Sequence, residues 1–428
     1  CDPDLTEEET AVLTSRLSRQ QQHQQQSSLL SGCEKCCQKD NCPVTRVRSA
    51  QAVCRQCFLA YCTHQFRAGF GKSQLIRAGE RVLVGFSGGN GACALLRLVK
   101  QGLAESTHRK LRFTPVFVYI DFATVFNDNG DGPLSGRRAA VLEQFDAHLP
   151  VEFERHCLTA AELLPGLSEA LAAMTDGTGY RELLHRSVHR CLALASRQFN
   201  CSRVLTGETA SRLAELTLRS VAQGRLSADS GAFSAIAAGG VCQVRPLRQL
   251  TSAETALLSW LAADGLMPVC PRPADPDSPL LNDGQGGGSI PGVIASFLGG
   301  LQQSFPATVY NILRTGEKLQ SDSVAAGSSS SDSAAAAATP CPACGLSMQQ
   351  QPSGDDGGNV RSNCNALRAL RLSENLARSG DSPEPSTAAA GLWAKEGGRY
   401  CYSCSVLLNG CSKRAVLEEC LIDADGAD

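Results

Sequence analysis

The chain has 428 residues, 43% of them hydrophobic, so it is long enough for two or three domains with a substantial core. Its 40 Lys and Arg residues nearly balance its 42 Asp and Glu residues, and the overall charge of −2 gives no global basic field to attract nucleic acid. No stretch has 18 consecutive apolar residues, so the sequence predicts no membrane-spanning helix.

The chain starts with the acidic stretch CDPDLTEEET, which lacks the apolar core of a secretory signal, so we expect no such signal. The first residue is Cys1 rather than Met, which suggests that an initiator residue has been removed. We therefore expect a cytoplasmic protein, and we expect its 21 cysteines to bind metal rather than to form disulfides.

Residues 1–32 are polar and Gln-rich, so we expect a disordered tail. The Cys-rich segment that follows, 33–62, contains CEKC and CRQC separated by seventeen residues. Two such pairs can surround one Zn²⁺ with four thiolates, and this closed coordination is typical of a structural site. The predicted ligands are Cys33, Cys36, Cys54 and Cys57, with Cys37, Cys42 and Cys62 as nearby alternatives.

Residues 63–270 are expected to form an α/β domain, which begins with a basic amphipathic connector at 63–80. Apolar, β-branched runs alternate with helical patterns along this segment. Such strands are typical of a doubly wound parallel sheet that is covered by helices on both faces. The five expected strands are 81–86, 113–120, 151–158, 202–208 and 241–247.

The remaining chain divides into three expected parts. Residues 271–320 are a loop followed by helices that break near Pro306, and 321–340 are a low-complexity linker. A split Cys-rich module with a disordered insert is expected at 341–428, and its CxxC pairs predict a second zinc site. The ligands of that site would be Cys341, Cys344, Cys401 and Cys404, with Cys364 and Cys411 as spare candidates.

A glycine-rich loop follows the first strand of the α/β domain and precedes a helix. Backbone N–H groups and the helix dipole bind anions at such a position, although an ordinary tight turn would have the same glycines. The loop consists of Ser87, Gly88, Gly89, Asn90, Gly91 and Ala92.

This loop resembles the PP-loop, S-G-G-x-D-S, of the ATP-pyrophosphatases that adenylate tRNA bases before thiolation. CRQCF, SGG, LTGETASRLAELTLRSVAQGR, VRPLR, SFPATVYNILRTGEKL and CYSC follow one another in the chain. As an ordered set they are similar to the cytoplasmic tRNA 2-thiolation protein 2 family. The resemblance implies a PP-loop, adenine nucleotide alpha hydrolase-like fold and a cytoplasmic heterodimer with the catalytic paralogue, cytoplasmic tRNA 2-thiolation protein 1. It further implies shared tRNA binding and sulfur from a thiocarboxylated ubiquitin-related modifier.

Several residues depart from the active PP-loop pattern. Gly91 and Ala92 replace the Asp and the second Ser, while Gly207 is retained from a G-H-N-A-D-D-like stretch. Without carboxylates there, no Mg²⁺ is expected over the phosphates, so ATP binding is doubtful and no catalytic residue is assigned. The other replacements are Glu208 for His, and Ser211 and Arg212 for the two acids. Cys191 comes too late in its stretch to match the sulfur-handling Cys of active relatives. Cys270 would supply only one thiol to a mechanism that uses several.

Basic residues of the connector, of VRPLR at the carboxyl end of the fifth strand and of RTGEKL are candidates for contacts with tRNA phosphates, although each could equally be a solvated surface charge. The candidates are Arg67, Lys72, Arg77, Arg245, Arg248, Arg314 and Lys318. His185 and His189 would share a helix face, which favours a pair facing a partner over a metal site.

The favoured function is a non-catalytic, tRNA-binding subunit of the complex that 2-thiolates the wobble uridine of tRNA. Two alternatives remain open at this point. One is a self-sufficient ATP-dependent, tRNA-adenylating sulfurtransferase, which the SGG turn would support. The other is a zinc-dependent adaptor that is unrelated to tRNA, in which the nucleotide fold only mediates contacts.

Overall fold

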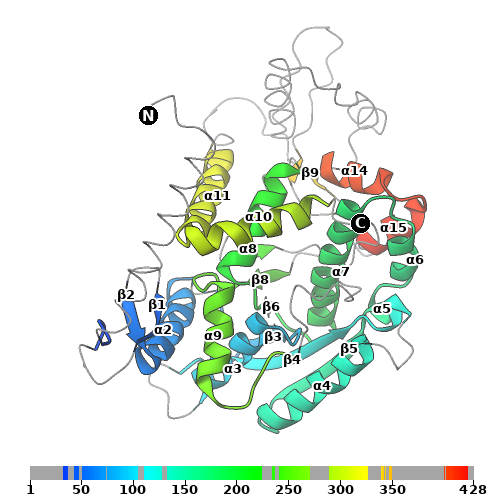
Figure 1. Ribbon diagram of the computed structural model, residues 1–428. Helices are drawn as coiled ribbons and strands as arrows, with labels where there is room; N and C mark the ends of the chain where they lie inside the picture. Colours follow the sequence, from blue (N-terminus) through cyan, green and yellow to red (C-terminus); the bar gives the residue numbers. More distant parts are fainter. Residues whose placement is uncertain are drawn as a thin grey trace, which may run out of the picture.

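The computed structural model (Figure 1) describes the parallel sheet, its helices and parts of both Cys-rich segments. The predictions for the tail 1–31, most of the linker, the insert of the C-terminal module and Cys270 fall outside the described residues. These are 32–36, 43–47, 51–73, 75–104, 110–127, 133–223, 234–236, 241–269, 289–325, 339–341, 343, 347–348, 400 and 402–422.

The central sheet has six strands in the order β5-β4-β3-β6-β8-β7. Neighbouring strands are parallel except for β7 (Ser234–Ile236), which pairs antiparallel with β8. The five parallel strands confirm the predicted ones; β7 was not predicted, because a three-residue run is too short to show a period. Their bounds are Arg81–Gly85 (β3), Thr114–Asp121 (β4), Glu154–Thr159 (β5), Arg203–Leu205 (β6) and Cys242–Val244 (β8).

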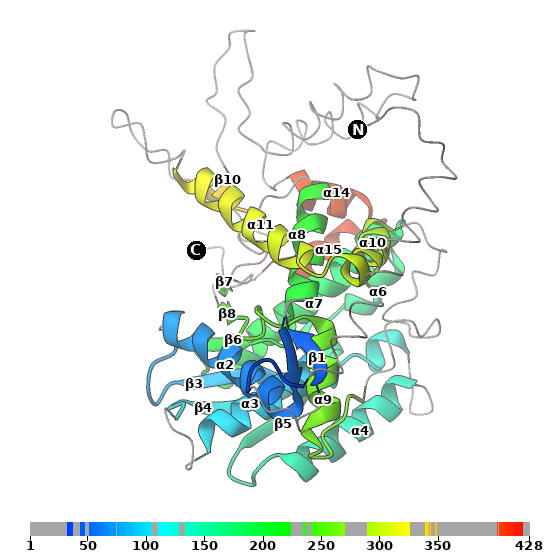
Figure 2. The ribbon, with the colours of Figure 1, turned by 60° about the vertical axis from the view of Figure 1, so that its left-hand side comes forward.

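Helices cover both faces of this sheet, as predicted from its unbroken apolar strands (Figures 1 and 2). In β3, Val82 and Val84 point into a core that they share with α3, α4 and α9, whereas Leu83 points into the core formed with α5, α6 and α7. The helices are α3 (Asn90–Leu103), α4 (Pro133–His148), α5 (Ala160–Leu163), α6 (Leu167–Ala172), α7 (Gly177–Gln198), α8 (Ala210–Ala222) and α9 (Ser252–Ala262), with a 3-10 turn, η1, at Thr124–Phe126.

Side-chain caps fix where several helices begin. The Thr251 hydroxyl accepts from the Glu254 N–H, and the Glu254 carboxylate accepts from the Thr251 N–H, which forms a capping box before α9. Asp176 caps α7 and Thr209 caps α8 in the same general way. The cap of α8 lies four residues after the end of β6, and Gly207 in the loop between them approaches Gly91 at the start of α3.

The last helices before the linker are α10 (Ile290–Ser304) and α11 (Thr308–Ala325), which pack on α8 in a third apolar cluster. Their break around Pro306 confirms the predicted interruption. No helix among the described residues is both long and apolar enough to cross a bilayer.

Both Cys-rich segments pack against the sheet domain. At the N-terminal end, the hairpin of β1 (Pro43–Val47) and β2 (Gln51–Cys54) leads into α2 (Arg55–Ser73), and all three share a core with α3 and α9. The C-terminal elements are β9 (Thr339–Pro340), β10 (Ser347–Met348), α14 (Tyr402–Asn409) and α15 (Arg414–Leu421). Of these, α14 contacts α7, and α15 contacts α6 and α7.

Candidate functional site

The glycine-rich loop lies where the strand order reverses, between β3 and β6. Parallel α/β sheets bind ligands in the crevice beyond the carboxyl ends of strands at such a point. Gly88 has a φ of +77°, a conformation that favours glycine, and Gly89 is the N-cap of α3. The Val269 N–H donates to the Gly88 oxygen at 2.8 Å, and the Arg137 guanidinium donates to the Ser87 oxygen at 2.7 Å. The predicted strand–loop–helix arrangement is therefore present.

The crevice at this point is closed by direct backbone contact between two glycines. A Cβ atom added to Gly91 would lie 2.1 Å from the Gly207 oxygen. A Cβ added to Gly207 would in turn lie 2.7 Å from the Gly91 carbonyl carbon and 2.8 Å from the Ala92 nitrogen. Main-chain atoms of Gly207 thus occupy the space that a side chain at position 91 would need.

We expect Gly91→Asp to destabilise the protein without creating a nucleotide site. The new side chain must push apart two backbone segments, and overpacking of this kind costs about 1–3 kcal/mol. Gly136→Asp is the matched control, since a Cβ at Gly136 meets nothing within 4 Å. Thermal unfolding and ATP titration of both variants test this. A Gly91→Asp protein as stable as the control that binds ATP would show that the crevice opens readily.

A buried ion pair lies beside the closed crevice, on the strand ends of β6 and β8. The Arg245 Nε donates to the Glu208 Oε2 at 2.7 Å, and both side chains are almost entirely buried. Burial would raise the pKa of Glu208, but the Arg245 charge and the hydrogen bond from His189 outweigh it and hold the pKa well below its usual range. The carboxylate is therefore neutralised by a protein cation, which leaves it poorly suited to hold Mg²⁺.

The two histidines of α7 face this pair and not the outside of the molecule. His189 Nδ1 lies 2.7 Å from the Gln243 Oε1, and its Nε2 lies 3.5 Å from the Glu208 Oε1. Burial, together with the charges of His189, Arg212 and Arg219, lowers the pKa of His185 well below its usual value. Gln243 and Glu208 satisfy His189 within the fold, and the expectation that the pair faces a partner stays a prediction.

The candidate tRNA-binding residues fall into different environments. Arg245 is buried with Glu208, and the Arg248 guanidinium, 12% exposed, forms an ion pair with Glu317 of α11. Arg248 and Arg314 line the same small cavity of about 280 Å³. Exposed positions are held by Arg77, Arg314 and Lys318, and Arg67 is half-buried on α2, whereas the Lys72 side chain is outside the described residues.

The N-terminal cysteines form one cluster, as predicted. The Sγ atoms of Cys33, Cys36, Cys54 and Cys57 all lie within 4.8 Å of one another. A tetrahedral zinc site needs sulfur atoms roughly 3.8 Å apart, given Zn–S bonds of about 2.3 Å, so the cluster requires only small adjustments. The β1–β2 hairpin places the second CxxC pair against the first, and the Cys54 N–H donates to the Cys33 Sγ at 3.2 Å.

The electrostatics of the cluster also suit a cation. Burial favours the neutral thiol of Cys33, but hydrogen bonds from the Cys36 and Cys54 backbone outweigh it and lower the pKa to about 6. Burial and the neighbouring thiols instead raise the pKa of Cys57 to about 12. Like charges therefore keep the four sulfurs from ionising together, and a bound divalent cation would remove that repulsion. The residues present can hold a metal ion.

The C-terminal cysteines are described only in part. Cys341 and Cys404 are buried in the same apolar cluster, whereas Cys344 and Cys401 lie outside the described residues. The Arg186 guanidinium donates to the Cys404 Sγ at 3.0 Å and also binds Glu182 at 2.7 Å. This contact could not be predicted from local patterns, because its partners are 218 residues apart. It links the second Cys-rich segment to α7.

Comparison with known proteins gives a consistent picture. A family model described as cytoplasmic tRNA 2-thiolation protein 2 matches residues 289–406. The chain is 30% identical to the Bos taurus protein of that name over 349 residues, which covers 67% of this chain and 68% of the relative. It is 27% identical to cytoplasmic tRNA 2-thiolation protein 2-A of Xenopus laevis, covering 71% of this chain and 70% of that one.

A solved structure has a similar fold. The U34-tRNA thiolase NcsA from Methanococcus maripaludis, determined with its [4Fe-4S] cluster, superimposes with a TM-score of 0.51 at 15% identity. The match covers 78% of this chain and 95% of the thiolase. This chain therefore shares its doubly wound fold with that structure.

Proposed function

Because the chain belongs to the cytoplasmic tRNA 2-thiolation protein 2 family, we propose that it is the non-catalytic, tRNA-binding subunit of a cytoplasmic complex that 2-thiolates the wobble uridine. The contact between Gly91 and Gly207 is the observation that carries this proposal. Adenylation needs phosphate-binding space and a cation over the phosphates. Here main-chain atoms of Gly207 leave no room for a side chain at position 91, and Arg245 neutralises the nearby carboxylate of Glu208.

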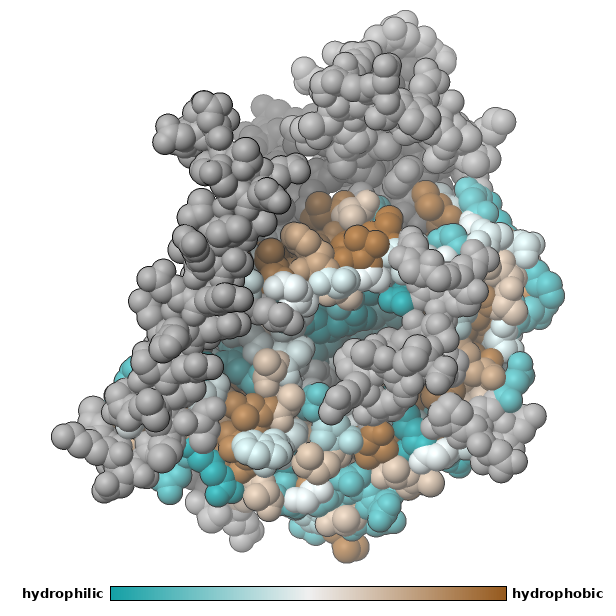
Figure 3. All heavy atoms as spheres, viewed as in Figure 1, coloured by the Kyte–Doolittle hydropathy of each residue, from teal (hydrophilic) through white to brown (hydrophobic). Residues whose placement is uncertain are grey.

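The catalytic work would then belong to a PP-loop paralogue, cytoplasmic tRNA 2-thiolation protein 1. An exposed apolar face on α10 supports an interface of this kind, since large apolar side chains grouped on a surface favour protein contacts. Figure 3 shows apolar residues gathered above a hydrophilic hollow on one face of the molecule. Val293 and Phe297 of α10 are each 58% exposed, and Phe305 after the helix is 61% exposed.

Zinc is the metal that we assign to the N-terminal cluster. Four thiolates in two CxxC pairs close the coordination shell, and a closed tetrahedral shell is typical of structural zinc. Its ligands would join the hairpin to α2 and so fix the start of the helix that carries Arg67. Zinc would thus support binding of tRNA without taking part in the transfer of sulfur, which a thiocarboxylated ubiquitin-related modifier would supply to the complex.

Affinity purification of the tagged chain from its own cytosol tests the proposed function. We expect recovery of a paralogue with an intact S-G-G-x-D-S loop, together with tRNA that contains 2-thiouridine. Neither pyrophosphate release nor thiolation should occur when the purified chain is incubated alone with ATP, tRNA and a sulfur donor. Thiolation by the chain alone would instead establish a self-sufficient enzyme, and recovery without paralogue or tRNA would favour an unrelated adaptor.

A further inference from the structure

A large groove lies at the opposite end of the sheet from the glycine-rich loop. Its volume is about 1510 Å³, and it is bounded by α2, the second half of α3 and the residues that precede β3 and β4. Pockets for small molecules usually measure about 300–1,000 Å³, so this groove is large for a metabolite. Binding here would not depend on the closed crevice at the other end of the strands.

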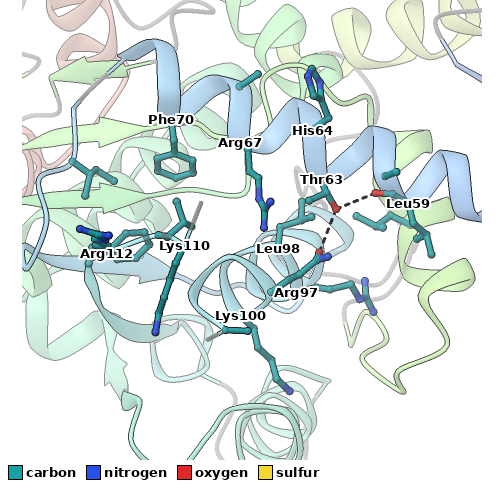
Figure 4. Close-up of a pocket in the computed structure, with 18 of the residues that line it drawn as sticks. Leu59, Thr63, His64, Arg67, Phe70, Arg97, Leu98, Lys100, Lys110 and Arg112 are labelled. Carbon is teal, nitrogen blue, oxygen red and sulfur yellow. Dashed lines mark hydrogen bonds between the residues drawn. The ribbon is translucent and has the colours of Figure 1, made fainter. Parts of the chain in front are cut away.

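Cations from separate parts of the chain line this groove, as Figure 4 shows. Six Lys or Arg residues and His64 line the groove, and Asp264 is the one acidic residue among the described residues that line it. Asp264 is already bound by Arg97, whose Nε and Nη2 donate to its two oxygens at 2.7 and 2.5 Å. The six cationic residues are Arg67, Arg77, Arg97, Lys100, Lys110 and Arg112. Positive charge is therefore concentrated in the groove, although the whole chain has nearly equal numbers of basic and acidic residues.

Backbone contacts hold the segment that carries Lys110 and Arg112. The Leu111 N–H donates to the Gly102 oxygen at 2.8 Å, which fastens the segment to the end of α3. The Gly79 N–H donates to the Arg112 oxygen at 2.6 Å, which ties the segment to the turn before β3. Both cationic side chains are exposed, so they are presented to solvent from a fixed backbone. Contact with a polyanion would therefore require these side chains to become ordered but not their backbone.

The floor of the groove is apolar and aromatic. Phe70 stacks on Phe113 with ring centroids 6.4 Å apart, and Leu98 and Ile76 also line the groove. A positively charged groove with aromatic side chains is typical of surfaces that follow a nucleic-acid backbone. A membrane surface would require exposed apolar side chains that project outward, whereas these line the inside of a hollow.

We propose that the groove between α2 and α3 binds the sugar-phosphate backbone of tRNA, with Lys110 and Arg112 as principal contacts. The identity of the RNA rests on the proposed function, whereas the polyanion site rests on the groove itself. Arg67 and Arg77, singled out from the sequence, lie in the same groove. The contacts are to phosphates, so they position the RNA and do not read its sequence.

The double variant Lys110→Glu, Arg112→Glu tests this in the purified complex with its paralogue. Binding of tRNA is measured over a range of salt concentrations. Lys413→Glu with Arg414→Glu is the matched control, since it changes the charge equally at the N-terminal end of α15. We expect the groove variant to bind at least about tenfold more weakly, with a log–log salt slope reduced by about 2, and the control to bind like wild type.

Each other outcome has a definite meaning. If the groove variant binds tRNA as tightly as the wild type does, the groove is not the binding site for tRNA. The proposed function would remain intact. Competition of polyglutamate with tRNA at equal charge concentration would overturn RNA as the occupant in favour of an acidic peptide. If thiolation of tRNA by the complex does not depend on this chain, the proposed function itself is overturned.

Discussion

Cys54→Ser should remove one metal ion per chain and unfold the N-terminal hairpin. Cys54 is 4% exposed and ends β2, so its sulfur is both a cluster member and part of the join to α2. Structural zinc stabilises small peptides by about 10–16 kcal/mol, so loss of a ligand should exceed the effect of an ordinary point mutation. Metal content by mass spectrometry and thermal unfolding by circular dichroism measure the two effects.

Cys62→Ser is the control for this prediction. Cys62 lies on α2 and is fully buried in the same apolar core, but it is outside the cluster of four sulfurs. We expect it to lose some packing energy and to keep its metal. The prediction would be refuted by a Cys54→Ser protein with the metal content of the wild type, or by equal loss of metal in both variants.

The same cysteines show how much of the site follows from sequence alone. The CxxC spacing identified Cys33, Cys36, Cys54 and Cys57 because thiolate geometry is encoded in local spacing and because a hairpin readily joins two such turns. The five parallel strands could also be predicted from the sequence, since β-branched runs between helical patterns are compatible with few other secondary structures. Local periodicity therefore sufficed for the fold and for the position of the glycine-rich loop.

The closed crevice and the groove depended on contacts that local patterns do not encode. Loss of the acid at Gly91 was evident from the sequence, but its contact with Gly207 depends on how closely two loops from different strands approach. The sequence did not predict a binding role for Lys110 and Arg112, because α2, which forms the other wall of their groove, is distant in sequence. VRPLR showed two positive charges, yet not that Arg245 would be buried, since arginine is usually exposed.

Glu208→Gln should destabilise the protein by about 3–5 kcal/mol, because it leaves the buried Arg245 without its counterion. The amide keeps the shape of the carboxylate, so lost packing contributes little. Glu169→Gln is the control, since the ion pair of Glu169 with Lys413 is exposed and such pairs contribute about 0–1 kcal/mol. Urea unfolding of both variants gives the two free energies.

The double variant Glu208→Gln, Arg245→Met separates charge from packing. If an uncompensated guanidinium is the cost, removing it should recover much of the stability, and the cycle should show strong coupling between the two positions. Equal losses from Glu208→Gln and Glu169→Gln would contradict this. Recovery in the double variant would indicate that the loss in Glu208→Gln comes from the unpaired Arg245 charge and not from lost packing at the ends of β6 and β8.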